Sequence, residues 1–329
     1  KKNIMEKNKF FEVFAVILSI ILLYSYLPTI VEITSDTGSA DFLWQASKCT
    51  FDGINFYSSY LSRDGECPYF MNDGAAYAQG FYIILYPFTF FEWNVAKILW
   101  FLLNIILIVS TIIILCKKFE LKSVETLLII FVVLYSIIIR INFIMGQHTI
   151  FTLFFLTLPF VYKSRLFTIL SGISYLKYNI GYVLFLLFFV SKEYKKIFLS
   201  LIPAISGLII FCLLTETNII ESIFQPIELS IFNAKYNGAT LNNIFLFNFF
   251  KDFSLFSEHI NYLLIGLFTL LFNIFFINKI NKRKNDLLKL SCLCLLALIS
   301  TPHWGHDYIL LTPLLIFSIK YYKFNLILN

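Results

Sequence analysis

Long apolar runs separated by short basic loops constrain this chain more than any other feature of its sequence. A helix needs about 20 apolar residues to cross the hydrocarbon core of a bilayer. Candidate runs are 11–31, 95–116, 123–139, 148–162, 197–215, 261–278, 287–300 and 308–320. Only 14% of the 329 residues are charged and 59% are hydrophobic, so a water-soluble core could not cover the apolar surface. We therefore expect an all-α polytopic membrane protein.

Two further apolar segments could either cross the membrane or stay on one side, and the positions of the basic residues decide between these alternatives. Segment 79–91 is apolar but short, and segment 166–190 is long but interrupted by Lys177. Lysine and arginine collect in the cytoplasmic loops of membrane proteins. All the basic clusters can face the cytoplasm only if 79–91 does not cross and 166–190 forms two short helices that turn near Lys177. The clusters are 1–9, 117–122, 163–165, 192–196, 279–289 and 320–323.

Placing all the basic clusters in the cytoplasm predicts about ten transmembrane helices in one membrane-embedded domain over residues 1–329, with both ends cytoplasmic. Residues 11–31 form the first span, 32–94 a large first extracytoplasmic loop, and 95–320 the remaining spans. The first run lacks the small-residue cleavage site of a signal peptide, so we expect it to be retained in the cell membrane. Because the net charge of +6 reflects the cytoplasmic clusters, it predicts no nucleic-acid partner.

Most side chains capable of chemistry fall in the predicted extracytoplasmic segments. Those segments are 32–94, 140–147, the turn at Lys177, 216–260 and 301–307. Any active site is therefore expected on the extracytoplasmic face. In the first of these segments, Asp36 and Asp41 follow directly after the first run. A carboxylate there could accept a proton from an attacking hydroxyl, and desolvation would raise its pKa. The alternative is that both only solvate the loop.

Cationic and amide side chains near the membrane surface are the next candidates. Glycine in Gly146-Gln147-His148 would let the backbone approach a ligand, to which Gln147 and His148 could donate hydrogen bonds. Arg140 could bind a phosphate or extend to lipid headgroups. Lys177 breaks an apolar stretch, where a lysine is costly unless an anion such as phosphate offsets its charge; it could instead sit at a turn that reaches water.

The densest polar cluster is the stretch 301–308, Thr-Pro-His-Trp-Gly-His-Asp-Tyr. His303, His306 and Asp307 could exchange hydrogen bonds with a sugar or a phosphate, and Trp304 could stack on a sugar ring. A zinc site needs three or four ligands, and the spacing does not match that of zinc hydrolases. We therefore expect no metal ion and no other cofactor.

Two of the six cysteines, Cys49 and Cys67, share the predicted first loop. They could form a disulfide if that loop faces an oxidising space, and two free thiols are the alternative. The other four lie in apolar segments and are expected to be small core residues.

At these residues the chain resembles glycosyltransferase family 87, the polyprenyl-phosphate-mannose-dependent enzymes of the GT-C superfamily. The resemblance runs from about residue 36 to 318 and rests on pieces that occur in order. They are Asp41-Phe42 with the following Gly53 and Tyr57, Pro87 with Ala96 to Trp100, Gly146-Gln147, Lys177, and the stretch 301–307.

The resemblance implies a GT-C-type fold and the inverting transfer of a hexose, with mannose as the first candidate. The donor would be a polyprenyl-phosphate sugar, and the acceptor a hydroxyl of a glycan or glycolipid. Asp41 would be the general base, with Asp36 as its competitor. Lys177 and Arg140 would hold the donor phosphate, while Gln147, His303 and His306 would position sugar or phosphate.

Two other functions stay open. A transporter or flippase of lipid-linked sugars would need polar residues on both faces of the membrane or midway across it. A polysaccharide polymerase or ligase would carry a large late loop with arginine-rich sites, and segment 216–260 is long but contains no arginine.

Overall fold

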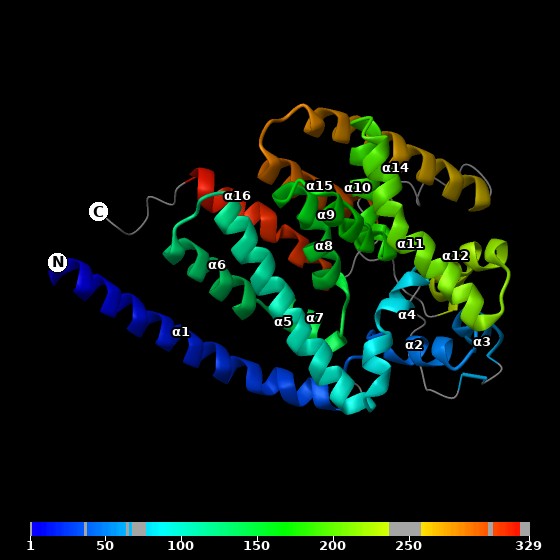
Figure 1. Ribbon diagram of the computed structural model, residues 1–329, viewed down its shortest axis with the longest axis horizontal. Coiled ribbons are helices and arrows are strands. Elements are labelled where there is room, and N and C mark those ends of the chain that lie inside the picture. Colours follow the sequence, from blue (N-terminus) through cyan, green and yellow to red (C-terminus); the bar gives the residue numbers. More distant parts are fainter. Residues whose placement is uncertain are drawn as a thin grey trace.

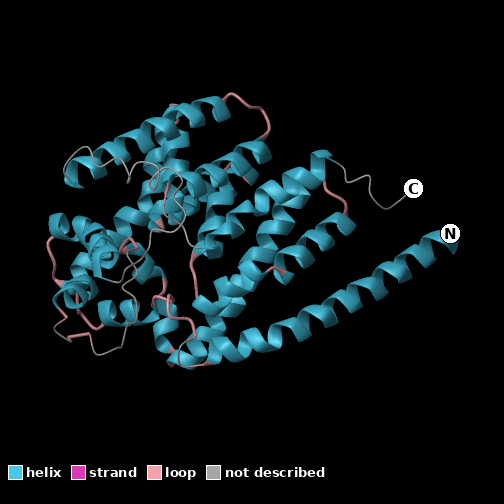
Figure 2. Cartoon of the chain, turned by 180° about the vertical axis from the view of Figure 1, so that it is seen from behind, coloured by secondary structure: helices cyan, strands magenta, loops and turns pink. Residues whose placement is uncertain are grey.

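The computed structural model of the chain describes residues 2–35, 38–63, 66–67, 77–236, 258–301 and 305–322. Within these ranges all regular structure is helical, as predicted (Figure 2). The elements in chain order are α1 (Lys2–Thr34), α2 (Trp44–Phe51), α3 (Phe56–Ser62), α4 (Gly80–Ile84), the 3-10 helix η1 (Tyr86–Phe90), α5 (Trp93–Lys118), α6 (Ser123–Tyr135), α7 (Ile137–Met145), α8 (Thr149–Val161), α9 (Arg165–Ser171), the 3-10 helix η2 (Gly172–Leu176), α10 (Tyr178–Val190), α11 (Tyr194–Thr215), α12 (Ile219–Tyr236), α14 (Glu258–Asn281), α15 (Asp286–Ser300), the 3-10 helix η3 (Gly305–Leu311) and α16 (Thr312–Tyr322).

Three of the described helices are long and apolar enough to cross a membrane. They are residues Ala15–Thr34 of α1, together with α5 and α11; the bent pair α6 and α7 makes a fourth if it counts as one span. Shorter apolar helices fill the centre of the molecule, among them α8 and α10. The structure therefore supports a multi-pass membrane protein, while the number of ten spans stays a prediction.

The two ambiguous segments are folded as the basic residues predict. Segment 79–91 forms α4 and η1, each of five residues, and neither is long enough to cross. Segment 166–190 breaks at Lys177, where η2 ends and α10 begins. Gly181 makes this break possible, because a Cβ there would lie 2.2 Å from the Ser174 carbonyl oxygen. The lysine is thus held between two short helices.

The sequence predicts a loop over residues 140–147, but α7 continues to Met145, so Arg140 lies within a helix. The chain bends by 56° between α6 and α7, where the Ser136 hydroxyl accepts a hydrogen bond from the Ile139 amide. One arginine within an apolar segment does not stop a helix, because arginine is itself a good helix former. The helix ends one turn later, at Gly146.

The two ends of the molecule differ in what they contain (Figure 1). At one end α1 begins and α16 ends, beside the turn between α5 and α6. At the other end the small helices α2, α3 and α4 of the first loop lie together, and α3 packs with α12. Buried aromatic rings hold this second end together: the Tyr57 ring lies 5.4 Å from that of Tyr82 and 5.7 Å from that of Phe211 in α11.

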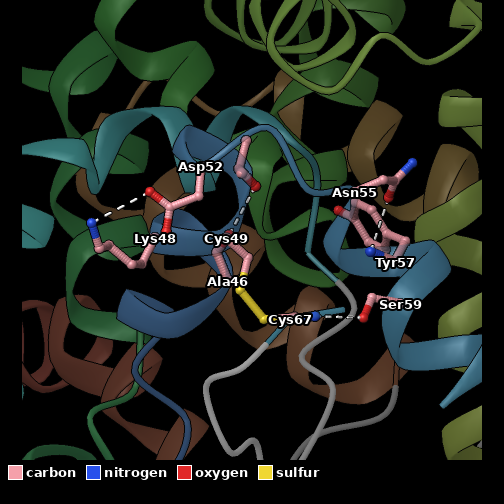
Figure 3. The surroundings of a disulfide bond; sticks show 9 residues. Ala46, Lys48, Cys49, Asp52, Asn55, Tyr57, Ser59 and Cys67 are labelled. Carbon is pink, nitrogen blue, oxygen red and sulfur yellow. Dashed lines mark hydrogen bonds and ion pairs between the residues drawn. A yellow bond between two sulfur atoms is a disulfide. The ribbon is translucent and has the colours of Figure 1, made fainter. Parts of the chain in front are cut away.

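A disulfide between Cys49 and Cys67 joins the end of α2 to the chain that follows α3 (Figure 3). The Cys67 amide also donates a hydrogen bond to the Ser59 hydroxyl at 3.0 Å. This decides between the two alternatives that the sequence leaves open. The other four cysteines are free, and three of them are buried, in line with the expected core role.

Replacing both Cys49 and Cys67 with serine is expected to destabilise the first loop. The bond closes a loop of sequence separation 18, and losing such a constraint costs about 3 kcal/mol. Thermal unfolding of the purified protein in detergent measures the effect. Cys292→Ala, in α15, is the matched control and should leave the midpoint within a degree or two. Equal midpoints for the double variant and the unchanged protein would contradict the prediction.

Candidate active site

An aromatic stack fixes the position of the residue that follows Asp41. Phe42 lies against Trp100, with ring centroids 5.0 Å apart and planes 10° apart, and against Trp93 at 6.0 Å. The Trp100 indole Nε1 donates to the Gly146 carbonyl at 2.9 Å. Three stretches that are far apart in the sequence therefore meet at Phe42: the first loop, the start of α5, and the turn after α7.

Only glycine fits at position 146. Its backbone has φ +68°, and an added Cβ would lie 2.8 Å from the Phe42 Cβ and 3.1 Å from that of Ser39. This close approach lets the first loop bond to the end of α7, where the Asp41 amide donates to the Met145 carbonyl at 2.9 Å. The glycine is thus needed for backbone contact between the two loops.

Gln147 connects the carboxylate of Asp41 with Tyr77. The Gln147 Nε2 donates to Asp41 Oδ2, and the Tyr77 hydroxyl donates to Gln147 Oε1 at 3.4 Å. Gln147 is buried, whereas Asp41 is half-buried. A hydrogen bond to the carboxylate limits its rotation. Asp41 is therefore held in one orientation.

Tyr77 also faces the buried lysine. The Lys177 Nζ lies 5.6 Å from the centroid of the Tyr77 ring. Burial, followed by the nearby carboxylates of Asp41 and Asp307, raises the pKa of the Tyr77 phenol well above its ordinary value. The phenol therefore keeps its proton and remains a hydrogen-bond donor at physiological pH. It links the Asp41 side of the cluster to the Lys177 side.

Lys177 forms a buried ion pair with Asp307. Its Nζ donates to Asp307 Oδ1 at 2.9 Å and to the Thr149 hydroxyl at 2.7 Å, and that hydroxyl in turn donates to Asp307 Oδ1. The two charged side chains are only 4% and 2% exposed. The His306 Nε2 lies 3.8 Å from the same carboxylate oxygen. A buried charge has to be paired and hydrogen-bonded. Lys177 and Asp307 pair with each other, and the Thr149 hydroxyl hydrogen-bonds to both.

His148 lies beside this cluster but within aromatic rings. Its ring centroid is 4.8 Å from that of Phe81, 4.9 Å from that of Trp100 and 5.1 Å from that of Tyr77. In the described part of the chain, neither of its ring nitrogens has a hydrogen-bond partner. In this structure His148 therefore fills space around Tyr77, and its predicted hydrogen bond to a ligand stays a prediction.

The remaining predicted residues are not brought to the cluster by any described contact. The Arg140 guanidinium lies 5.9 Å from the Tyr135 ring centroid, and its buried Nε has no hydrogen-bond partner among the described residues. Asp36, His303 and Trp304 lie outside the described residues. The structure therefore brings together Asp41, Gln147, His148, Lys177, His306 and Asp307.

Sequence reasoning missed three residues of the site. Tyr77 and Thr149 link its charged groups, and the Asn142 side chain donates to the His306 carbonyl, which ties η3 to α7. Tyr77 is one of 19 tyrosines, so its type alone gave no signal. Asn142 and Thr149 flank Gly146-Gln147, and their polarity in an apolar region was the available signal. The described residues include no cluster of metal-ligand type.

Comparison with known proteins gives one match. The sequence model of glycosyltransferase family 87 matches residues 76–302. This range includes Tyr77, Gln147 and Lys177, and it ends shortly before His306 and Asp307. No curated protein and no solved structure matches the chain.

Gly146→Ala is expected to destabilise the protein by at least about 1 kcal/mol, because alanine is strained at this φ and its Cβ would clash with Phe42. The matched control is Gly266→Ala in α14, where an added Cβ meets nothing within 4 Å. The control should leave the thermal midpoint unchanged or slightly raised. A Gly146→Ala midpoint equal to that of the control would refute the packing argument.

Lys177→Met and Asp307→Asn should each destabilise strongly, by about 3–5 kcal/mol, because each leaves a buried charged group without its partner. The double variant Lys177→Met/Asp307→Asn should lose less stability than the sum of the single variants. Lys48→Met tests the effect of exposure, because the Lys48–Asp52 pair is 33% and 39% exposed and should be worth less than about 1 kcal/mol. Thermal unfolding in detergent measures all four. Additive losses at Lys177 and Asp307 would show that the two do not act as a pair.

Proposed function

Because the match covers more than half of its length, the chain belongs to glycosyltransferase family 87, and we propose that it transfers a hexose, mannose above all, from a polyprenyl-phosphate donor to an acceptor hydroxyl. Family membership makes it a glycosyltransferase that uses a sugar donor and an acceptor. Its long apolar helices make it a membrane protein. The proposal adds the donor, the sugar, the face of the membrane and the chemical roles.

The observation that carries the proposal is a carboxylate connected through two side chains to a buried cation. Asp41 is oriented by Gln147, and Gln147 is linked through Tyr77 to Lys177. In the proposed step the acceptor oxygen attacks C1 of the sugar as its proton passes to the Asp41 carboxylate. The bond between C1 and the phosphate oxygen breaks, and polyprenyl phosphate leaves with the electron pair. Attack opposite to the leaving group inverts C1.

Lys177 is proposed to stabilise the leaving phosphate. A cation positioned where negative charge develops lowers the barrier most in a site that excludes water. Asp307 neutralises Lys177 at 2.9 Å when no donor is bound, so a donor phosphate would share or replace this partner. Gln147 bonds to Asp41, and His306 lies beside Asp307. Both are proposed to position the sugar or the phosphate. Arg140 is left out of the proposal, because no described hydrogen bond or ion pair connects it with this cluster.

The proposed reaction takes place on the extracytoplasmic face. The disulfide in the first loop supports this side, because disulfides persist in oxidising compartments. The distribution of basic loops supports the same orientation. The alternatives of a flippase or a polysaccharide polymerase gain nothing from the family match, which supports transfer chemistry.

Asp41→Asn is expected to abolish transfer, by at least about a hundredfold, while the protein still inserts and folds. Membranes that contain each variant are incubated with radiolabelled polyprenyl-phosphate-mannose, and labelled product is measured together with protein level. The matched control is Asp52→Asn, an exposed carboxylate of the same loop, which should retain activity. Activity retained in Asp41→Asn but lost in Asp36→Asn would move the base to Asp36.

A further inference from the structure

Helix α12 exposes most of its isoleucine and phenylalanine side chains and buries two of its polar side chains. Ile220 is 70% exposed and Phe224 53%, whereas Ser222 is fully buried and Gln225 is 2% exposed. A surface helix of a soluble protein shows the opposite arrangement. The sequence places this helix within the predicted loop 216–260, so its amphipathic pattern is a finding of the structure.

The side chains of α12 fall into three sectors around its axis, at about 100° per residue. One sector of about 140° is exposed and, apart from Ser230, apolar; it consists of Ile219, Ile220, Ile223, Phe224, Ile227 and Ser230. Beside it lie two exposed carboxylates, Glu221 and Glu228. The third sector is buried and consists of Ser222, Gln225, Pro226 and Leu229. The three sectors therefore differ in character: the first is mostly apolar and exposed, the second carries exposed carboxylates, and the third packs against protein.

Hydrogen bonds to the first loop fix the rotation of the helix. The Gln79 Nε2 donates to the Ser222 carbonyl. The Asn55 Nδ2 donates to Gln225 Oε1 at 3.3 Å, and the Gln225 Nε2 donates to the Ser58 hydroxyl at 3.3 Å. The buried sector of α12 is therefore hydrogen-bonded to α3 and to the residues that precede α3 and α4. The apolar sector cannot turn inward without breaking these bonds.

The apolar sector follows a helix that also exposes apolar side chains. Helix α11 is long and apolar enough to span the membrane, and its exposed side chains include Ile205 and Leu213. It ends at Thr215, Glu216 turns the chain with φ +53°, and α12 begins at Ile219. The two helices lie next to each other (Figure 1). The exposed apolar side chains of α11 are therefore followed in the chain by those of α12.

We propose that α12 lies along the membrane surface nearest to α3 and α4, with its apolar sector in the hydrocarbon of that leaflet. Glu221 and Glu228 then point toward the headgroups and water. The helix is not among those that are long and apolar enough to cross the membrane. The exposed apolar sector lies next to two carboxylates, and the one basic residue of α12, Lys235, follows near its end, so burial of apolar area holds the helix in place and anionic lipid is not required. The partner is thus the bilayer itself.

Site-directed spin labelling tests the proposal. Cys116, Cys212, Cys292 and Cys294 are replaced with alanine, and a single cysteine is introduced as Ile223→Cys or, as the matched control, Glu228→Cys. The labelled full chain is reconstituted into nanodiscs of phosphatidylcholine, and collisions with oxygen and with a water-soluble nickel chelate are measured. The label at 223 should favour oxygen severalfold and the label at 228 should favour nickel. Adding phosphatidylglycerol should change neither ratio.

Three results would overturn the proposal. Preference for nickel at both positions would place the apolar sector in water. Low collision rates with both reagents at 223 would mean that protein covers it, and dipolar broadening between labels would then identify a second copy of the chain. A preference for oxygen that appears only with phosphatidylglycerol would make the attachment electrostatic. Ile220→Cys, in the same sector, repeats the measurement should Ile223→Cys fail to fold.

Discussion

A lysine buried at a break between two short apolar helices is the constraint on which the centre of this molecule depends. An ammonium group at that depth must have an anionic partner and further hydrogen bonds. Lys177 finds them in Asp307 of η3 and in Thr149 at the start of α8. The break itself requires Gly181, whose missing side chain lets α10 start against η2. Three stretches that are distant in the sequence are thereby tied to one charge.

Much of the fold could be predicted from the sequence, because lipid as a solvent leaves few choices. Apolar runs with basic ends predict helices and exclude a soluble core. The same logic located the break at Lys177, since only two short helices there let all basic clusters share one side. The resemblance to a family selected Asp41 and Gln147 as site residues, and the structure adds that Gln147 donates to the Asp41 carboxylate. No periodicity in the sequence could have shown it.

Other features depend on spatial contacts that residue types do not specify. Two cysteines in one loop can bond only if their backbones approach closely, and spacing alone does not determine this. Tyr77 resembles every other tyrosine until the fold places it between Gln147 and Lys177. Arg140 was predicted in a loop because charge usually ends a span, yet α7 continues past it. Helices such as α8 are shorter than the bilayer is thick, so their length alone does not identify them as spans.

The aromatic stack around Phe42 gives the protein a built-in optical probe. Three of its four tryptophans belong to that layer, since Trp93 and Trp100 stack on Phe42 while Trp44 packs against Trp93 at 5.7 Å. Indole emission responds to the polarity and packing of its surroundings. Tryptophan fluorescence of the unlabelled protein therefore reports mainly on the surroundings of Phe42, on one side of Asp41. A molecule that displaces Phe42 on binding would change the wavelength and the intensity of this emission.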